Sequence, residues 1–359
     1  MRSTTVFDCF CGFGGLSLGA ELAGLNVLGG VDANAAAVEV YAQCFPKAKA
    51  LNRDLLVARP GKILRDAGIS RGDVDILVGG PPCQPYSINN HQRGVHDSRC
   101  ELVQRYLEFV STLRPNWLLM ENVPAFASIE GGKFLQDLLR SLRGRGYSTA
   151  FGVFDATCFG VPQKRRRLVV LAGRDRSRLA PAMNEIAARR DQTVNVGEAL
   201  GDLPESISPV AHYSGVPSGT FQSLMRLNAF PSIQAHIAPK LGEKNLRRIR
   251  HVPAGGNWRN IPRALLPPGM QRAELNDHTT RYGRLLPTKP AFTLLTKCDP
   301  HWGCFVHPTQ DRIITIREAA RLQSIPDRVH FTGTMSASYK LIGNAVPPLL
   351  AKGILETIR

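Results

Sequence analysis

The stretch Val6-Phe-Asp-Cys-Phe-Cys-Gly-Phe-Gly-Gly15 carries the strongest indication of the fold. Its apolar first half, residues 6–10, predicts a buried strand, and residues 16–23 have the apolar spacing of a helix. The glycines between them let the backbone turn sharply and approach a ligand, and the first amides of a helix are free to bind one. The stretch therefore predicts a strand, a tight turn and a helix that together accept a small polar molecule.

Outward from this stretch, short β-rich runs alternate with helical patterns over the first 175 residues. The expected strands are residues 6–10, 27–31, 76–78, 117–120, 148–154 and 168–172. The expected helices are residues 16–23, 35–44, 102–113 and 134–143. Such alternation is typical of an α/β fold with a parallel sheet.

An acid ends the second expected strand, because Asp32 follows Val31. In nucleoside-binding α/β folds, an acid at this position accepts hydrogen bonds from the two ribose hydroxyls. The turn from Phe10 to Gly15 does not match G-x-G-x-x-G, which disfavours a nicotinamide dinucleotide. The sequence therefore favours a nucleoside ligand of another kind.

Length and composition are those of an ordinary globular protein, with 359 residues, 43% hydrophobic and 21% charged. This length predicts a main domain and a smaller one. No apolar run is long enough to span a membrane and no secretory pattern opens the chain, so we expect a cytoplasmic protein without membrane contact. The eight cysteines include no C-x-x-C pair, which indicates reduced thiols.

The net charge of +16, from 45 basic and 29 acidic residues, favours a polyanionic partner. Part of the excess is local, since residues 240–272 hold eight Lys or Arg and one acid, Glu243. This segment lies in a region, from about Arg174 to Lys297, that is rich in Pro, Gly, Arg and Asn and has no clear period. We expect an irregular second domain there. Regularity returns at Thr315, whose spacing to Glu318 predicts a capping box.

A thiol follows the third expected strand in Gly79-Gly-Pro-Pro-Cys83-Gln-Pro-Tyr-Ser87. Most free cysteines are buried hydrophobic residues. Here the neighbours are glycine and proline, and the loop follows a strand at the edge where parallel sheets form active sites, so a nucleophile is favoured. A zinc deaminase would need P-C-x-x-C, but Tyr86 stands at the last position, and we expect no metal site.

Two further motifs lie at strand ends. Glu121 and Asn122 follow the apolar run at 117–120, where a carboxylate can act as an acid or can simply end the strand. Gln163-Lys-Arg-Arg-Arg167 precedes the expected strand at 168–172. Alternate residues of an extended segment point the same way, so we expect Arg165 and Arg167 to share one face.

These motifs together resemble the ordered motif set of the DNA cytosine-5 methyltransferases. The motifs are Phe10-x-Gly-x-Gly-Gly15, Pro81-Pro-Cys83-Gln, Glu121-Asn-Val123, Gln163-x-Arg165-x-Arg167, Arg317-Glu-x-Ala-Arg-Leu-Gln323 and Gly343-Asn-x-Val-Pro347. The resemblance implies a Rossmann-like class I methyltransferase domain with a smaller, irregular target-recognition domain. The implied bounds are residues 1–174 for the catalytic domain, 175–297 for target recognition and 298–359 for a segment that completes the catalytic domain.

The resemblance also implies a role for each matching residue. Cys83 would be the nucleophile, Glu121 would hold and protonate cytosine at N3, and Arg165 would support the target base. The S-adenosyl-L-methionine pocket would comprise Phe10, Gly12, Gly14, Gly15, Asp32, Asp54, Pro82, Leu102 and Asn344, and the product would be S-adenosyl-L-homocysteine. Gln84, Ser87 and Arg167 would contact DNA. Ala33 departs from members that carry tryptophan after the ribose-binding acid.

The implied reaction needs a target cytosine flipped out of duplex DNA, because its carbon 5 is inaccessible within the stack. The alternatives are an RNA cytosine-5 methyltransferase, a catalytically silent DNA-binding or scaffold protein, and a nicotinamide oxidoreductase. We expect a monomer associated with the nucleoid. The sequence leaves open the recognition sequence and whether a cognate restriction endonuclease is a partner.

Overall fold

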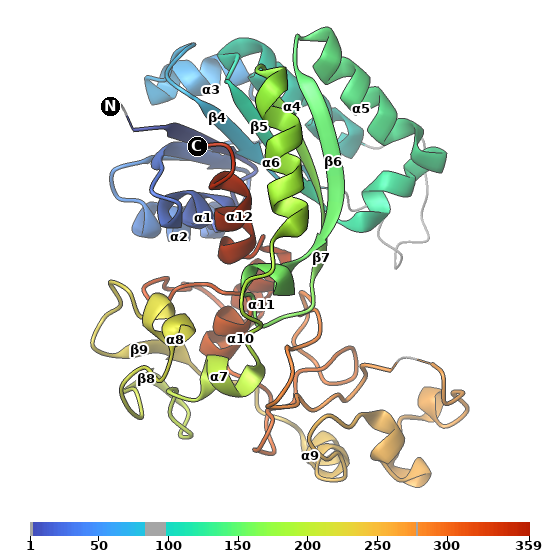
Figure 1. Ribbon diagram of the computed structural model, residues 1–359. Helices are drawn as coiled ribbons and strands as arrows, with labels where there is room; N and C mark the ends of the chain where they lie inside the picture. The colour runs from blue at the N-terminus through green and yellow to red at the C-terminus, as the bar shows by residue number, and fades with distance from the viewer. Residues whose placement is uncertain (1–2, 83–97, 278) are drawn as a thin grey trace. The chain divides into compact units, whose positions relative to one another are not determined.

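Seven strands form the sheet that the alternating pattern predicts, in a computed structural model that describes residues 3–82, 98–277 and 279–359 (Figure 1). The strands are β1 (Thr5–Cys9), β2 (Asn26–Asp32), β3 (Lys49–Asn52), β4 (Ile76–Gly79), β5 (Trp117–Asn122), β6 (Ser148–Asp155) and β7 (Arg166–Gly173). Their order across the sheet is β3-β2-β1-β4-β5-β7-β6. All six expected strands are therefore confirmed.

The sheet is not wholly parallel, which corrects the expectation from sequence. Strand β7 runs antiparallel to both β5 and β6, while β1 to β5 run parallel to one another. Only the short connection from residue 156 to residue 165 separates β6 from β7, and it contains no crossover helix of the length that parallel strands need. The edge strand β3 was not predicted, because it is only four residues long and none of them is fully buried.

Helices cover both faces of the sheet (Figure 1). They are α1 (Gly15–Leu22), α2 (Ala35–Cys44), α3 (Pro60–Ala67), α4 (Ser98–Leu113), α5 (Lys133–Gly144), α6 (Arg176–Ala188) and α12 (Pro348–Leu355), with the 3₁₀ segments η2 (Pro124–Gly132) and η3 (Ala156–Phe159). The four expected helices are confirmed as α1, α2, α4 and α5. None of the helices in the described residues is long and apolar enough to cross a membrane.

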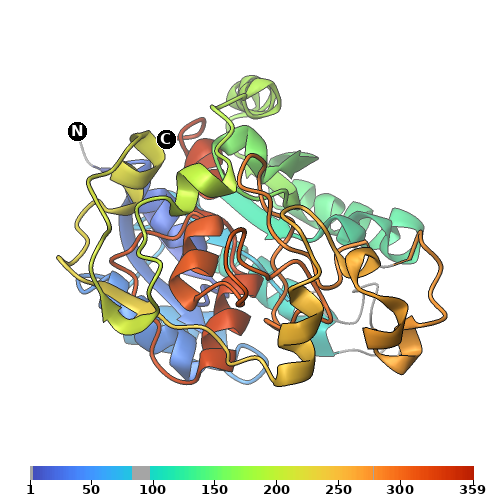
Figure 2. The same cartoon turned by 90° about the horizontal axis from the view of Figure 1, so that it is seen from below.

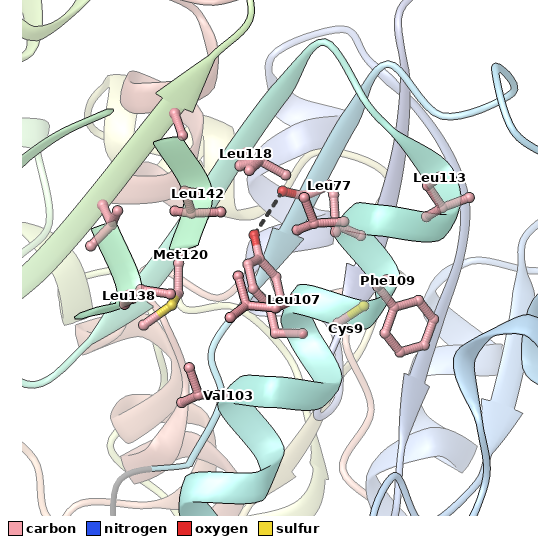
Figure 3. Close-up of a cluster of buried hydrophobic side chains, with 14 of the residues drawn as sticks. Cys9, Leu77, Val103, Leu107, Phe109, Leu113, Leu118, Met120, Leu138 and Leu142 are labelled. Atoms are coloured by element: carbon pink, nitrogen blue, oxygen red, sulfur yellow. Dashed lines mark hydrogen bonds between the residues drawn. The ribbon is translucent and has the colours of Figure 1, made fainter. Parts of the chain in front are cut away.

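The main hydrophobic core lies on the face covered by α3, α4 and α5 (Figure 3). Alternate strand residues such as Leu118 and Met120 meet Leu107 of α4 and Leu138 of α5 there, and all four are at most 3% exposed. The opposite face carries Asp8, which accepts a hydrogen bond from Ser17 of α1. The period-2 alternation of the strands thus sends apolar side chains to the core and a carboxylate to the α1 face.

The described residues form two compact units. The first, called the sheet unit, comprises Met1–Phe159, Arg166–Arg190 and Val346–Arg359. The second unit comprises Gly160–Arg165 and Asp191–Ala345. These units divide the chain by compactness, whereas the expected bounds at residues 174 and 297 divide it by role, and those bounds stay a prediction.

The second unit has short regular elements, which corrects the expectation of an aperiodic region from Arg174 to Lys297. Its elements are α7 (Val196–Leu200), β8 (Ser208–Ala211), α8 (Thr220–Met225), β9 (Ile233–His236), α9 (Glu243–Ile249), η4 (Trp258–Asn260), η5 (Arg263–Leu265), η6 (Pro268–Met270), α10 (Ile316–Leu322) and α11 (Met335–Asn344). Strands β8 and β9 pair antiparallel, and α10 packs against α11 (Figure 2). The predicted capping box is confirmed, since Thr315 and Glu318 exchange both hydrogen bonds.

Helix α6 also lies within the region expected to be irregular, yet it packs on β6 and β7 of the sheet unit. Its start has a recognisable signal, because the Asp175 side chain accepts a hydrogen bond from the Ser177 amide. Pro181 within the helix obscures the helical pattern, since proline is disfavoured in helix interiors. If the target-recognition region belongs to the second unit, it therefore does not include α6.

Candidate active site

The turn after β1 has the conformation that its glycines predict. Phe10, Gly12 and Gly14 all have positive φ, at 61°, 54° and 105°. A Cβ on Gly15 would lie 2.4 Å from the Val346 carbonyl oxygen, whereas a Cβ on Gly12 would meet no atom of the described residues within 4 Å. Gly15 is therefore required by packing, and the backbone at Gly12 faces open space that a ligand can enter.

Asp32, at the end of β2, holds this turn in place. Its Oδ2 accepts a hydrogen bond from the Gly12 amide at 2.9 Å, and its Oδ1 accepts one from the Asn34 amide at 2.8 Å. A carboxylate has about four lone-pair sites, so two remain for hydroxyl donors. The side chain is only half-buried. This donor and acceptor arrangement fits the ribose of a nucleoside.

The end of β3 borders Asp32, although this strand was not predicted. The Asn52 side chain donates to the carbonyls of Asp32 and Ala33, at 3.1 Å and 3.0 Å, and the Arg53 amide donates to the Asp32 carbonyl. Asp54, two residues beyond Asn52, is exposed, and its Oδ1 accepts a hydrogen bond from the Leu56 amide. Two expected acids therefore stand at the carboxyl ends of neighbouring parallel strands.

The remaining expected pocket residues are distributed between the two units. Phe10 and Leu102 are partly buried and pack on the same hydrophobic core of the sheet unit. Pro82 is half-buried just after β4. Asn344 is the exposed last residue of α11 and belongs to the second unit.

The segment that leads to the expected nucleophile runs beside the end of β5. Residues Gly79 and Met120 are register partners, and the Asn122 side chain donates a 2.9 Å hydrogen bond to the Pro81 carbonyl. A Cβ on Gly80 would lie 3.4 Å from Glu121 Oε2. Cys83, Gln84 and Ser87 lie outside the described residues. The described segment nevertheless brings residue 81 into contact with the Glu121-Asn122 pair.

Glu121 is 9% exposed and forms an ion pair with Arg167 of β7, with Nε and Oε1 2.6 Å apart. Burial lowers the pKa of Arg167, and the neighbouring Glu121 counteracts that effect. A short charge-assisted bond of this kind fixes the orientation of the carboxylate. The antiparallel register makes the contact, because Glu121 of β5 pairs with Val169 of β7 and Arg167, two residues from Val169, lies on the same face.

Arg165 has different partners from Arg167. Its side chain is 1% exposed and donates to the carbonyl oxygens of Leu294, Gly343 and Ala345, at 3.3 Å, 2.7 Å and 3.1 Å. Strand β7 begins at Arg166, so strand alternation does not relate the side chain of Arg165 to that of Arg167. The expected support of the target base by Arg165 stays a prediction.

The Gln163 side chain, like that of Arg165, binds backbone segments of the second unit. It is fully buried, its Oε1 accepts the Leu294 amide at 2.9 Å, and its Nε2 donates to the Leu322 carbonyl at 3.1 Å and to Gln323 Oε1 at 2.5 Å. The Gln323 side chain in turn donates to the carbonyl of Ala345. The first half of the Gln163-x-Arg165-x-Arg167 motif therefore binds the chain's own backbone, and the last arginine contacts the candidate acid.

Comparison with known proteins agrees with these motifs. A type II methyltransferase of Thalassovita gelatinovora, M.AgeI, is 29% identical, and the alignment covers 98% of each chain. M.XorII, a type II methyltransferase of Xanthomonas oryzae, is 31% identical over 97% of this chain and 82% of the relative. A prophage-encoded E. coli protein described as a DNA modification methyltransferase has a crystal structure that matches with a TM-score of 0.80 and 25% identity, covering 99% of this chain and 98% of that one.

The expected Rossmann-like methyltransferase fold is confirmed by that structural match. The sequence profile of one family, the C-5 cytosine-specific DNA methylases, matches residues 4–359, which is nearly the whole chain. The chain therefore belongs to the C-5 cytosine-specific DNA methylases, the family of methyltransferases that its motifs predict.

Proposed function

We propose that the chain methylates carbon 5 of a cytosine that is flipped out of a specific duplex DNA sequence, through a covalent adduct to Cys83. The observation that carries this proposal is the end of β5, where Asn122 binds the Pro81 carbonyl and Glu121 lies beside Gly80. A candidate acid is thus held next to the segment that leads to the candidate nucleophile. Chemistry on a duplex base requires the base to leave the stack.

The residues around Gly12 and Asp32 fit S-adenosylmethionine, because open space at Gly12 adjoins a carboxylate with unused lone pairs. The bound cofactor would supply a methyl group on a sulfonium. Asp32 would accept the ribose hydroxyls, and Asp54 would lie near the adenine amino group. The family resemblance adds Phe10, Gly14, Gly15, Pro82, Leu102 and Asn344 to this pocket.

The carbon 5 atom of cytosine is a poor nucleophile, because its attack would interrupt the conjugation of the ring. A thiolate from Cys83 adding to carbon 6, with Glu121 donating a proton to N3, makes an enamine that can attack the methyl group. A base, for which a water molecule is the candidate, then removes the carbon 5 proton, and the carbon 6–sulfur bond breaks to release the Cys83 thiolate. Return of the N3 proton to Glu121 restores the cytosine ring.

Arg167 also acts on the reacting centre in this proposal, in addition to the support of the target base that is predicted for Arg165. Its ion pair with Glu121 orients the carboxylate that must reach N3. Arg165 also holds the segments around Leu294 and Gly343 together. Arg167→Lys is expected to lower kcat with an unchanged cofactor affinity, because a lysine ammonium cannot reproduce the planar guanidinium contact.

The second unit supports duplex DNA as the substrate, since eight basic residues and one acid lie between Lys240 and Arg272. Within the expected target-recognition region, the part from Asp191 onward would read the bases, because α6 packs on the sheet. The protein would act as a monomer at the nucleoid, with a cognate restriction endonuclease as the candidate partner.

Transfer of a labelled methyl group to duplex DNA and to transfer RNA tests the substrate. We expect label in DNA alone, and bisulfite sequencing should find protected cytosines in one fixed context. Label in transfer RNA alone would assign the chain to the alternative RNA reaction.

Cys83→Ala tests the covalent step. We expect this variant to lose methyl transfer and to retain cofactor binding. Cys158→Ala is the matched control, because Cys158 is a free, partly exposed thiol outside the family motifs and should be dispensable. Duplex DNA with 5-fluorocytosine at the target should form a denaturation-resistant complex with wild type and with Cys158→Ala, because fluorine cannot leave as a proton does. Turnover by Cys83→Ala would refute the adduct.

A further inference from the structure

One tryptophan of this chain is exposed, and the other two are buried. Trp117 and Trp258 are 4% and 3% exposed, whereas Trp302 of the second unit is 50% exposed. Leaving a large apolar ring half in water forgoes the stability that its burial would give. Exposed tryptophan and arginine are enriched where proteins bind a partner.

Arg281 is stacked on this exposed ring. The central carbon of its guanidinium lies 5.2 Å from the centroid of the Trp302 ring. Within the described part of the chain Arg281 makes no ion pair or side-chain hydrogen bond, unlike Arg284, which donates to a carboxylate and to backbone carbonyls. The stack therefore orients a guanidinium whose donors are available to a ligand.

The stack is supported by a series of rings that begins inside the second unit. Tyr282 is 1% exposed, and its ring is nearly perpendicular to that of His301, with centroids 5.9 Å apart. His301 meets Trp302 at 5.0 Å, again nearly perpendicular. The buried end of this series thus fixes the exposed end.

Backbone hydrogen bonds fix the same segment. The Tyr282 amide donates to the Pro300 carbonyl at 2.5 Å, and the Trp302 amide donates to the Asp299 carbonyl at 3.0 Å. The Asp299 carboxylate accepts the His301 amide at 2.8 Å, so the one acid of the segment from 297 to 302 caps the local backbone. Arg281 itself is tied down by its carbonyl, which accepts the Trp258 amide at 3.0 Å.

We propose that Arg281, oriented by its stack on Trp302, reads a base edge of the target DNA, with the O6 and N7 acceptors of a guanine as the matching pair. This inference rests on the proposed function, since it assigns one recognition residue for that reaction. A phosphate accepts a cation from many directions, whereas a base edge demands an oriented guanidinium, and a bidentate arginine is the commonest specific contact to guanine. The basic character of the second unit matches a DNA partner.

The test begins with methylome sequencing of a host that expresses the wild-type chain, which defines the recognition sequence. Methylation rates are then measured on duplexes that carry each single base-pair change, for wild type, Arg281→Ala, Trp302→Ala and Arg259→Ala. Arg259 is the matched control, because it is an exposed arginine whose guanidinium lies 6.0 Å from the centroid of a tryptophan ring that is itself buried, Trp258. Cofactor affinity checks that each variant is folded.

For Arg281→Ala we expect a loss of about 10- to 100-fold on the cognate duplex, with discrimination lost at one guanine position and the salt dependence of DNA binding unchanged. Trp302→Ala should relax the same position by a smaller factor, and Arg259→Ala should relax none. A uniform loss on every duplex with a shallower salt slope would make Arg281 a phosphate contact and overturn the inference. Unchanged rates and selectivity would assign the stacked pair to a protein partner instead. A wild-type chain that methylates no duplex would refute the proposed function itself.

Discussion

The two compact units satisfy their buried backbone groups in different ways. In the sheet unit, strand ladders pair the carbonyls and amides, and apolar side chains such as Leu118 and Leu142 fill the core (Figure 3). In the second unit, where regular elements are short, buried arginine side chains donate to carbonyls that no ladder reaches. Because buried carbonyls must be paired, an irregular fold needs such donors.

Arg284 shows this most fully. It is 6% exposed, and it donates to the carbonyls of Val252, His307, Gln310 and Ile249. A guanidinium offers five donors in one plane, so a single side chain can hold several backbone segments. Arg165, Arg317 and Arg321 also donate to backbone carbonyls, and each is at most 1% exposed.

The comparison changes how the net charge of +16 is interpreted. Four of the positive charges in the second unit are internal and cannot contact a phosphate in the folded protein. The charge count from sequence therefore overestimates the basic surface, and it conceals the structural role of these arginines. The residues that read the DNA bases must be sought among cations that keep some exposed surface, such as the half-buried Arg281 of the stacked pair.

The largest expected effect follows from removing one buried arginine. Arg321 donates to both carboxylate oxygens of Asp327, at 2.6 Å each, and to Asp202 at 2.9 Å and 3.2 Å. Arg321→Met would leave two buried carboxylates short of their main cation, which should destabilise the second unit by about 3–5 kcal/mol. Hydrogen exchange resolved by segment should show lost protection in the second unit first.

A core truncation in the sheet unit is the counterpart. Leu118→Ala should cost about 2–5 kcal/mol through lost burial and a cavity. Its loss of protection should begin in the sheet unit. If Arg321→Met reduced protection by less than about 1 kcal/mol, the buried arginines would not be what holds the second unit together.

The next effect concerns Asp8 in the sheet unit. Burial raises the pKa of Asp8 to about 7 from 3.8, a change that its hydrogen bond from Ser17 opposes and the nearby charge of Asp32 assists. Between about pH 4 and pH 7 the folded protein keeps the Asp8 proton, whereas the unfolded chain has released it. The free energy of unfolding therefore falls as pH rises through this range. Asp8→Asn cannot ionise and should be more stable than wild type at pH 8, by on the order of 2–4 kcal/mol.

Urea unfolding of wild type and Asp8→Asn at pH 5 and pH 8 measures this effect. Asp137→Asn is the control, because Asp137 pairs with Arg140 on the exposed face of α5. If the free energy of unfolding of Asp8→Asn differed from that of wild type by the same amount at pH 5 and at pH 8, Asp8 would not be protonated in the folded protein.

His307 in the second unit should respond to pH in the opposite direction. Burial lowers its pKa to about 4, although Glu318 favours the charged form. Its Nδ1 accepts the amides of Thr309 and Gln310, at 3.3 Å and 3.2 Å, which a proton on that nitrogen would prevent. Below about pH 6.5 the unfolded chain takes up a proton that the folded chain does not, so stability falls by about 2 kcal/mol between pH 7 and pH 5.

His307→Asn should flatten this dependence, because an amide oxygen can accept the same two bonds without titrating. Segment-resolved hydrogen exchange at pH 7 and pH 5 is the measurement. A second unit that loses no more protection at pH 5 than the sheet unit would refute the opposite responses of the two units.

The same contrast explains which features the sequence could predict. The strands of the sheet unit have apolar runs, and Glu121 was identified because an acid ends such a run. Its contact with Arg167 was not predicted, because it depends on β7 lying antiparallel to β5. The sequences of the two strands do not indicate their relative direction. The second unit has little periodicity to detect, since its segments are held by long-range arginine contacts such as Arg165 to Gly343.

Capping boxes show that local signals were present even there. Thr315 was identified because an apolar helical pattern follows it, but Asn195 begins the same pattern with Glu198 and was missed because α7 has only five residues. The local physics is the same in both, and only the length of the helix behind it differs.

The smallest expected effect tests that equivalence. Asn195 Oδ1 accepts the Glu198 amide at 2.8 Å, and Glu198 Oε2 accepts the Asn195 amide at 2.8 Å. The amides of Val196 and Gly197, the first two of α7, donate instead to the carbonyls of residues 289 and 287. The capping box therefore pairs the amides that have no such backbone acceptor. Asn195→Ala should therefore cost about 1 kcal/mol, and Asn195→Asp, which retains an acceptor, should cost a few tenths at most. Thermal unfolding of both variants beside wild type measures the difference. If Asn195→Ala were as stable as Asn195→Asp, water would replace the cap, and only long-range contacts would define the start of α7.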